Sequence, residues 1–360
     1  MVAKRKRGQG TLNDTDDDGI LSPETFDKVK LDAIANTNSI IKTDSVRVLT
    51  GSLDSVLGGY DFFVSPFRVQ QVYHEAAHIM AITAIGRIGR YLATGSKDEK
   101  IWLWDLKRRI TLGEIFEHQA DITWLGFRGR YLISCDSQGI IMITRTRDWE
   151  PVARMKAKAR INHFSLHPSG KIAISVGADK CVRLWNMMTG RKASANRLRK
   201  EGLVVEWSPS GIGYAIMYDQ GISFYGMDAI EQFAIKPTSR LTCMTYGYFK
   251  TKIALFVGSQ DGHVRVYEDD KELYDFHSGK SRIKAISFYG QYLVSAASDG
   301  TLQLYDMNRG VLVGDHKTTD RLTSVLVVPS DLEEDRNGLN SPVIGHDDDR
   351  PKTADVQKHS

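Results

Sequence analysis

A unit of about 40 residues recurs along this chain, and this repetition limits the possible folds more than any other feature. Each copy reads as a short apolar strand, a turn, a strand of small residues, an Asp-containing turn and a strand with an aromatic end. The clearest copies are YLATGSKDEKIWLWDL (91–106), KIAISVGADKCVRLWNM (171–187), IALFVGSQDGHVRVYED (253–269) and YLVSAASDGTLQLYDM (292–307), and weaker copies lie at 46–62, 131–146 and 213–228. The turn aspartates are Asp54, Asp98, Asp136, Asp179, Asp219, Asp261 and Asp299, which lie 44, 38, 43, 40, 42 and 38 residues apart.

This period indicates a ring of small sheets, because about four strands in each 40-residue unit are typical of a β-propeller. Val, Ile, Tyr and Trp alternate with small or polar residues in the expected strands, and Gly, Asp, Asn and Ser occupy the expected turns. The innermost strands are expected to begin near Ile79, Ile122, Ile161, Leu203, Leu241, Ile283 and Leu322. We therefore predict an all-β, seven-bladed β-propeller over residues 41–329, between disordered tails at 1–40 and 330–360.

The two ends of the repeat region are incomplete in a complementary way. The first expected second strand, at Val46, has no inner strand before it, and the last inner strand, RLTSVLVV (321–328), has no partner after it. Pairing these two segments closes the ring by N- and C-terminal strands and leaves no open sheet edge. Cutting the chain before Arg321 is then expected to destabilise the whole domain.

The repeats resemble the WD-repeat superfamily over roughly 41–329, and more specifically the PAK-interacting/maintenance-of-killer family of nucleolar proteins. The segments that carry this resemblance are TGSKDE (94–99), LHPSGKIAISVGADK (166–180), VEWSP (205–209), SAASDG (295–300) and RLTS (321–324). The resemblance implies a role in maturation of the large ribosomal subunit precursor and, as in animal members, binding and restraint of a PAK-type kinase. Many members end in a Lys-rich tail, whereas this sequence ends in HDDDRPKTADVQKHS (346–360). We therefore expect contacts with RNA to come from the propeller surface and not from a tail.

Composition bears on where such a protein works. No segment approaches the roughly 18 consecutive apolar residues that a membrane-spanning helix needs, so we expect no membrane partner. Cys135, Cys181 and Cys243 form an odd set without a C-x-x-C pair, which favours reduced thiols in a cytosolic or nuclear compartment. The basic run Lys4, Arg5, Lys6 and Arg7 predicts nuclear import, and the family resemblance implies the nucleolus. We expect a monomer.

Several motifs could indicate chemistry instead. HEAAH (74–78) matches the H-E-x-x-H zinc-protease pattern, which requires a helix, but it lies where an outer strand is expected to lead into the next inner strand. DTDDDGILSPET (14–25) nearly matches a calcium loop, with Thr25 where a bidentate Glu is needed. Isolated histidines at 118, 163, 167, 277 and 316 fall at turn or blade-entry positions, where structural hydrogen bonds are expected. We therefore predict no catalytic residues, no cofactor and no metal.

Basic charge concentrates on one predicted face. Residues 41–329 carry a net charge of +9 between ends of −1 and −4. Propeller topology places the turns after the first and third strands of each blade on the same face. The cationic residues in or beside those turns, over three adjacent blades, are Arg87, Arg90, Lys107, Arg108, Arg109, Arg128, Arg130, Arg145, Arg147, Arg191 and Lys192. They predict a docking face for phosphates or for an acidic protein surface. The alternative interpretation is that these charges are scattered and only keep the protein soluble.

The sequence thus favours a non-catalytic scaffold in large-subunit ribosome biogenesis, whose partner is the pre-ribosomal particle through its assembly factors or the backbone of its RNA. The alternative function is an adaptor that binds and inhibits a PAK-type kinase, and both roles can coexist. A third class, a zinc protease at HEAAH, depends on a helix across residues 72–85.

Overall fold

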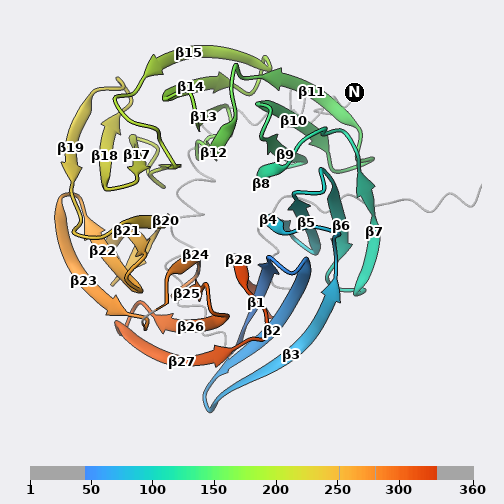
Figure 1. Ribbon diagram of the computed structural model, residues 1–360, viewed down its shortest axis with the longest axis vertical. Coiled ribbons are helices and arrows are strands. Elements are labelled where there is room, and N and C mark those ends of the chain that lie inside the picture. The colour runs from blue at the N-terminus through green and yellow to red at the C-terminus, as the bar shows by residue number, and fades with distance from the viewer. Residues whose placement is uncertain (1–44, 251, 280, 331–360) are drawn as a thin grey trace, which may run out of the picture. The chain divides into compact units, whose positions relative to one another are not determined.

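The computed structural model describes residues 45–250, 252–279 and 281–330, which form 28 strands in seven four-stranded antiparallel sheets. The sheets stand around a common centre as the blades of a ring (Figure 1). In this part of the chain the prediction of an all-β, seven-bladed propeller is confirmed. No helix among the described residues is long and apolar enough to cross a bilayer.

Each blade contains strands a to d, counted from the centre outward. Blade 1 consists of β28 (Leu322–Pro329), β1 (Ser45–Ser52), β2 (Val56–Val64) and β3 (Phe67–Ala76). Blade 2 consists of β4 (Ile82–Ile88), β5 (Tyr91–Ser96), β6 (Ile101–Asp105) and β7 (Ile110–Ile115), and blade 3 of β8 (Ile122–Arg128), β9 (Tyr131–Asp136), β10 (Ile140–Arg145) and β11 (Pro151–Lys156). Blade 4 consists of β12 (Ile161–Leu166), β13 (Ile172–Gly177), β14 (Cys181–Asn186) and β15 (Arg191–Arg197), and blade 5 of β16 (Val204–Trp207), β17 (Gly213–Tyr218), β18 (Gly221–Gly226) and β19 (Glu231–Ile235). Blade 6 consists of β20 (Leu241–Phe249), β21 (Lys252–Ser259), β22 (His263–Glu268) and β23 (Lys271–His277), and blade 7 of β24 (Ile283–Tyr289), β25 (Tyr292–Ala297), β26 (Thr301–Asp306) and β27 (Val311–Lys317).

The position of a strand within its blade explains its composition. Every residue of the b strand β5, YLATGS, is buried, because blades pack on both of its sides. Every residue of the outer strand β15, RKASANR, is exposed. Small and apolar residues therefore mark the inner strands, and polar residues mark the rim.

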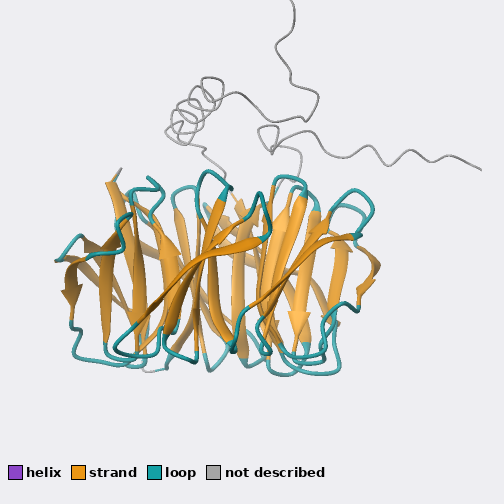
Figure 2. Ribbon diagram, turned by 90° about the horizontal axis from the view of Figure 1, so that it is seen from above, coloured by secondary structure: helices purple, strands orange, loops and turns teal. Residues whose placement is uncertain are grey.

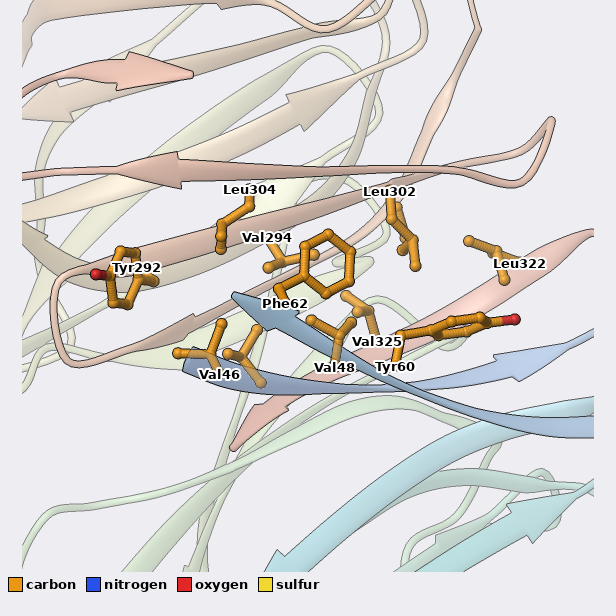
Figure 3. Packing of buried hydrophobic residues seen from close by; sticks show 12 residues of the cluster. Val46, Val48, Tyr60, Phe62, Tyr292, Val294, Leu302, Leu304, Leu322 and Val325 are labelled. Atoms are coloured by element: carbon orange, nitrogen blue, oxygen red, sulfur yellow. The ribbon is translucent and has the colours of Figure 1, made fainter. Parts of the chain in front are cut away.

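The ring closes between the two ends of the repeat region. β28 pairs antiparallel with β1, so that Leu49 faces Leu326 and Thr50 faces Val325. Tyr60 and Phe62 of blade 1 pack with Leu322 and Val325 of β28 against blade 7 (Figure 3). Four buried side chains of β28 thus contribute about 1.5–3 kcal/mol each, which is comparable to the whole stability of a typical domain.

Neighbouring blades are also tied by hydrogen bonds near the centre. The Thr323 hydroxyl donates to the carbonyl oxygen of Ile82 at 2.5 Å, and the Thr83 hydroxyl donates to that of Ile122 at 2.5 Å. Asn162 Nδ2 donates to the Gly202 carbonyl oxygen at 3.0 Å in the corresponding place between blades 4 and 5. In these three blades a polar residue at the second position of strand a therefore links consecutive blades.

One expected strand begins later than the sequence suggested. Strand a of blade 2 starts at Ile82, not near Ile79, which is 83% exposed. The amides of Ala77 and His78 donate to the Ser55 carbonyl oxygen, and that of Ile79 donates to an Asp98 carboxylate oxygen. These bonds fix residues 77–80 as a connection between blades, so the strand cannot begin until they end.

All strands run between two opposite faces that carry the turns (Figure 2). We call the face with the a–b and c–d turns the a–b face. The opposite face, with the b–c turns and the connections between blades, is the b–c face.

Candidate docking surface

The turn aspartates of the b–c face are held by partners within the ring. In blade 2, His78 Nδ1 lies 3.0 Å from Asp98 Oδ2, and His78 Nε2 lies 2.9 Å from the Thr94 hydroxyl, which also accepts from Trp104 Nε1 at 3.0 Å. Burial lowers the pKa of His78 despite the nearby carboxylate. Burial favours protonated Asp98, but the Ile79 amide and the charge of His78 outweigh it and lower the Asp98 pKa. The network therefore anchors the connection from blade 1.

Asp136 of blade 3 contacts a histidine as Asp98 does, but from a different position. It lies in a strand and not, as predicted, in a turn. It is the last residue of β9, and Gln138 occupies the position equivalent to Asp98, before the left-handed Gly139 (φ 87°). Asp136 Oδ2 lies 2.8 Å from His118 Nδ1, and His118 Nε2 lies 2.6 Å from the Ser134 hydroxyl. A shift of two residues keeps a side chain on the same side of a strand, so the contact with histidine survives.

The other turn aspartates pair with Arg or Lys. These pairs are Asp54 with Arg321 (2.8 Å), Asp179 with Arg183, Asp219 with Arg240, Asp261 with Arg265 (2.9 Å) and Asp299 with Lys317 (2.7 Å). Burial favours protonated Asp299, but hydrogen bonds from Lys317 and Thr301 lower its pKa to about 2. Each of these carboxylates is therefore bound by a cation of the protein itself.

The HEAAH segment lies in strand β3 and the connection after it, where no helix forms. His74 Nε2 contacts Asp320 Oδ2 at 2.8 Å, and His78 belongs to the Asp98 network. Within residues 45–330 that the structure describes, no three His, Cys, Asp or Glu side chains are grouped to hold a metal ion. The segment at 14–25 that nearly matches a calcium loop and the basic run at 4–7 lie outside the described residues.

The remaining histidines contact strands and turns. His163 Nδ1 lies 3.0 Å from the Val205 carbonyl oxygen, and His167 Nε2 lies 3.1 Å from that of Gly211. His277 Nδ1 lies 3.1 Å from His263 Nε2, and the ring of His316 lies against Tyr60. These contacts join strands or neighbouring blades.

Among the eleven predicted cationic residues, Arg90, Arg128 and Arg145 contact neighbouring groups of the a–b face, and Arg87 is half-buried. Arg90 Nε lies 3.3 Å from Asp105 Oδ2, and Arg145 pairs with Asp148 at 2.5 Å. Arg128 donates to the Pro168 carbonyl oxygen of the next blade, and Arg87 is half-buried within β4. Their contacts serve mainly to stabilise the turns.

The other seven are exposed on turns or at strand starts, and we call them, with Lys171, the basic arc. Its members are Lys107, Arg108, Arg109, Arg130, Arg147, Lys171, Arg191 and Lys192. Sequence reasoning missed Lys171, although it is the last residue of the HPSGK turn (167–171). Arg191 and Lys192 are the first residues of β15 and not turn residues.

Local hydrogen bonding explains how the turns present these side chains. Asp105 Oδ1 accepts from the amides of Lys107 and Arg108, each at 3.0 Å, and Asn186 Oδ1 accepts from the amides of Met188 and Thr189. Because the acidic or amide side chain binds the backbone of its own turn, the following side chains extend to solvent.

The charge on the a–b face is unevenly distributed around the ring. The turns of blades 2–4 contain seven basic residues and two acidic residues, whereas those of blades 5 and 6 contain Lys250 against Asp228, Asp269 and Asp270. Scattered solubilising charge would not concentrate in this way on consecutive blades. The arrangement creates a positive potential over one part of the face.

A cavity of about 290 Å³ lies among the inner strands, with His163, Glu206 and Lys284 in its lining. Glu206 Oε2 accepts from the Ser165 hydroxyl at 3.1 Å. Burial raises the pKa of Glu206 to about 7 and lowers the pKa of His163 to about 4. Ionisation of Glu206 therefore opposes folding as the pH rises toward neutrality.

Comparison with known proteins places this ring in a family. The family model "WD domain, G-beta repeat" matches residues 69–105, 149–186 and 271–306, and each match runs from an outer strand through strands a to c of the next blade. A p21-activated protein kinase-interacting protein 1-like protein from Danio rerio is 30% identical over 308 residues, covering 81% of this chain and 83% of that protein. This chain belongs to that family of WD-repeat proteins.

Two other members of the family are fungal. Protein MAK11 from Saccharomyces cerevisiae is 31% identical, over 73% of this chain and 76% of its own. Shk1 kinase-binding protein 15 from Schizosaccharomyces pombe is 26% identical, over 79% of this chain and 85% of its own. WD-repeat propellers are typically non-catalytic scaffolds, and two of these three relatives are named for proteins that they bind.

A solved structure supports the fold alone. The crystal structure of the computationally designed Ika8 protein aligns with a TM-score of 0.61 at 19% identity, and the alignment covers 78% of this chain and 90% of that chain.

Proposed function

We propose that this WD-repeat protein is a platform in assembly of the large ribosomal subunit, and that the basic arc docks on an anionic part of the precursor particle. The concentration of exposed Lys and Arg on blades 2–4 is the observation that carries this proposal. The family resemblance of the repeats implies the pathway, and a yeast relative carries the name MAK11. Work in the nucleolus, with import through Lys4, Arg5, Lys6 and Arg7, belongs to the same proposal.

Physical chemistry fits a polyanionic partner. Contacts between Lys or Arg and phosphate release counterions, so binding through the arc weakens as salt rises. Such contacts set position and carry little sequence information. The protein would therefore recognise the particle by shape and charge.

Charge reversal tests this proposal. In the variant Lys107→Glu, Arg108→Glu, Arg130→Glu, we expect co-sedimentation with large-subunit precursors to fall roughly tenfold or more, because attraction becomes repulsion. The matched control reverses three exposed lysines of the b–c face, Lys97→Glu, Lys158→Glu, Lys200→Glu, and should co-sediment like the wild type. Unchanged co-sedimentation of the first variant would contradict the proposal.

A second candidate is supported by the printed names of the relatives, which include kinase-interacting and kinase-binding proteins. In this role the propeller would bind and restrain a PAK-type kinase. A pull-down with the regulatory segment of such a kinase separates the two roles, because only this role predicts its capture in the absence of ribosomal precursors.

A further inference from the structure

The a–b face carries a second surface beside the basic arc. Four exposed apolar residues of blades 4 and 5, which we call the apolar patch, lie in its turns: Met188 (59% exposed), Ile212 (75%), Met227 (54%) and Ile230 (63%). Single exposed apolar residues are ordinary, but neighbouring ones mark interaction sites.

Contacts between the turns show that three of these residues are neighbours. Ile212 stands directly before Gly213, which pairs with Gly226 across β17 and β18, and Met227 follows Gly226. Ile230 lies in the same turn, because its carbonyl oxygen accepts from the Gly226 amide at 3.1 Å. The turns that carry Ile212, Met227 and Ile230 are therefore adjacent.

The apolar patch is also continuous with the basic arc. The Met187 amide donates to the Lys171 carbonyl oxygen at 2.9 Å, which places Met188 beside a member of the arc. Arg128 of blade 3 donates to Pro168 of blade 4, and His167 of blade 4 contacts Gly211 of blade 5. The a–b turns of blades 3, 4 and 5 thus form one connected edge that changes from basic to apolar.

The turn under Ile212 is held in place before any partner arrives. His167 Nε2 contacts the Gly211 carbonyl oxygen, and the His167 ring meets that of Trp207 edge-on with centroids 4.8 Å apart. Gly211 adopts a left-handed φ of 73°, and an added Cβ there would lie 2.7 Å from His167. A turn fixed in this way presents Ile212 without the entropy cost of ordering a loop on binding.

We infer that this edge binds a protein segment in which acidic residues adjoin aliphatic ones, the acids meeting the basic arc and the aliphatic side chains covering the apolar patch. The inference deepens the proposed function and rests on it, since it names the class of partner within the precursor particle. Charge complementarity selects an acidic partner. RNA binds proteins through phosphates and by stacking bases on aromatic rings, and the apolar patch is aliphatic, so a protein segment fits the whole edge.

Site-specific photo-crosslinking tests the identity of the partner. Benzoyl-phenylalanine replaces Ile212 in the full-length protein, and also Ile79, an exposed apolar residue of the b–c face, as the matched control. After irradiation of purified precursor particles, we expect a protease-sensitive, RNase-resistant adduct from position 212 on a segment with several Asp or Glu within about ten residues, and none such from position 79. An RNA adduct, a segment without acidic excess, or no adduct at position 212 overturns the inference.

Co-sedimentation separates this inference from the proposed function. Because lost aliphatic contacts weaken binding, Ile212→Ser, Met227→Ser should lower co-sedimentation roughly threefold or more, and Ile79→Ser, Met80→Ser should not. If only the charge-reversed arc variant loses binding, the inference fails while the proposed function stands. If that variant keeps its binding, the proposed function fails.

Discussion

The two faces of the ring both carry many charges but use them differently. On the b–c face, turns and connections contain twelve basic and eleven acidic residues, and every turn aspartate singled out in the sequence pairs with a His, Arg or Lys. On the a–b face, carboxylates such as Asp105 and Asp306 accept from backbone amides of their own turns, and exposed cations accumulate on blades 2–4. Ion pairs thus hold the fold on the b–c face, whereas exposed cations on blades 2–4 of the a–b face offer a surface to a partner.

The largest expected effect on stability comes from breaking a buried pair of the b–c face. His118→Ala leaves Asp136 and Ser134 buried without their partner, so the free energy of unfolding should fall by about 3 kcal/mol. Urea denaturation followed by tryptophan fluorescence measures this loss. Lys317→Ala, which breaks an exposed pair of the same face, is the control and should cost about 0.5 kcal/mol or less. Equal losses in the two variants would mean that burial does not set the strength of these pairs.

A smaller effect on stability is expected from Glu206 in the cavity among the inner strands. Since the pKa of Glu206 rises from its usual 4.5 to about 7 on folding, the folded protein holds this proton more tightly than the unfolded chain. The wild type therefore loses stability from this group as the pH rises from about 4.5 to 7. Glu206→Gln can still accept from Ser165 and should be as stable as the wild type at pH 4.5 but more stable at pH 8, by on the order of 1–3 kcal/mol.

Thermal unfolding of both proteins across this pH range gives the measurement. His163 titrates in both proteins, so its contribution cancels in the difference. A difference in stability that does not change with pH would show that water solvates Glu206 in this cavity.

The smallest effect on stability is expected for the exposed cations of the a–b face. The arc variant Lys107→Glu, Arg108→Glu, Arg130→Glu should change the free energy of unfolding by no more than about 0.5 kcal/mol, because these exposed side chains add little to folding. Urea denaturation measures it beside the His118 variant. A loss of several kcal/mol would make the arc part of the fold and would remove the contrast between the faces.

The fold could be predicted from the sequence because the period of the repeat depends on local turn chemistry that recurs in each blade. The closure by β28 followed from counting strands at Val46 and Leu322. Asp136 was misplaced because Gln138 stands before Gly139, where blades 6 and 7 have an aspartate. Only the contact with His118 shows that Asp136 takes over the role of that aspartate. Spacing alone cannot show such a transfer.

The docking surface was less predictable, because exposure and pairing depend on contacts between blades. Nothing in the sequence shows that Arg128 binds the Pro168 carbonyl oxygen of the next blade. Lys171 and Ile212 belong to the surface because ring closure brings consecutive a–b turns together at one edge. The chemistry of individual turns was visible in the sequence, but their combination into one face was not.

Lysine footprinting tests most directly whether the a–b face is the one that binds. Acetylation of exposed lysines is compared by mass spectrometry between the protein alone and the protein in purified large-subunit precursors. We expect protection of Lys107, Lys171 and Lys192 on the a–b face, with Lys97, Lys158 and Lys200 on the b–c face modified equally in both states. Protection of the second set with continued modification of the first would show that the b–c face binds instead.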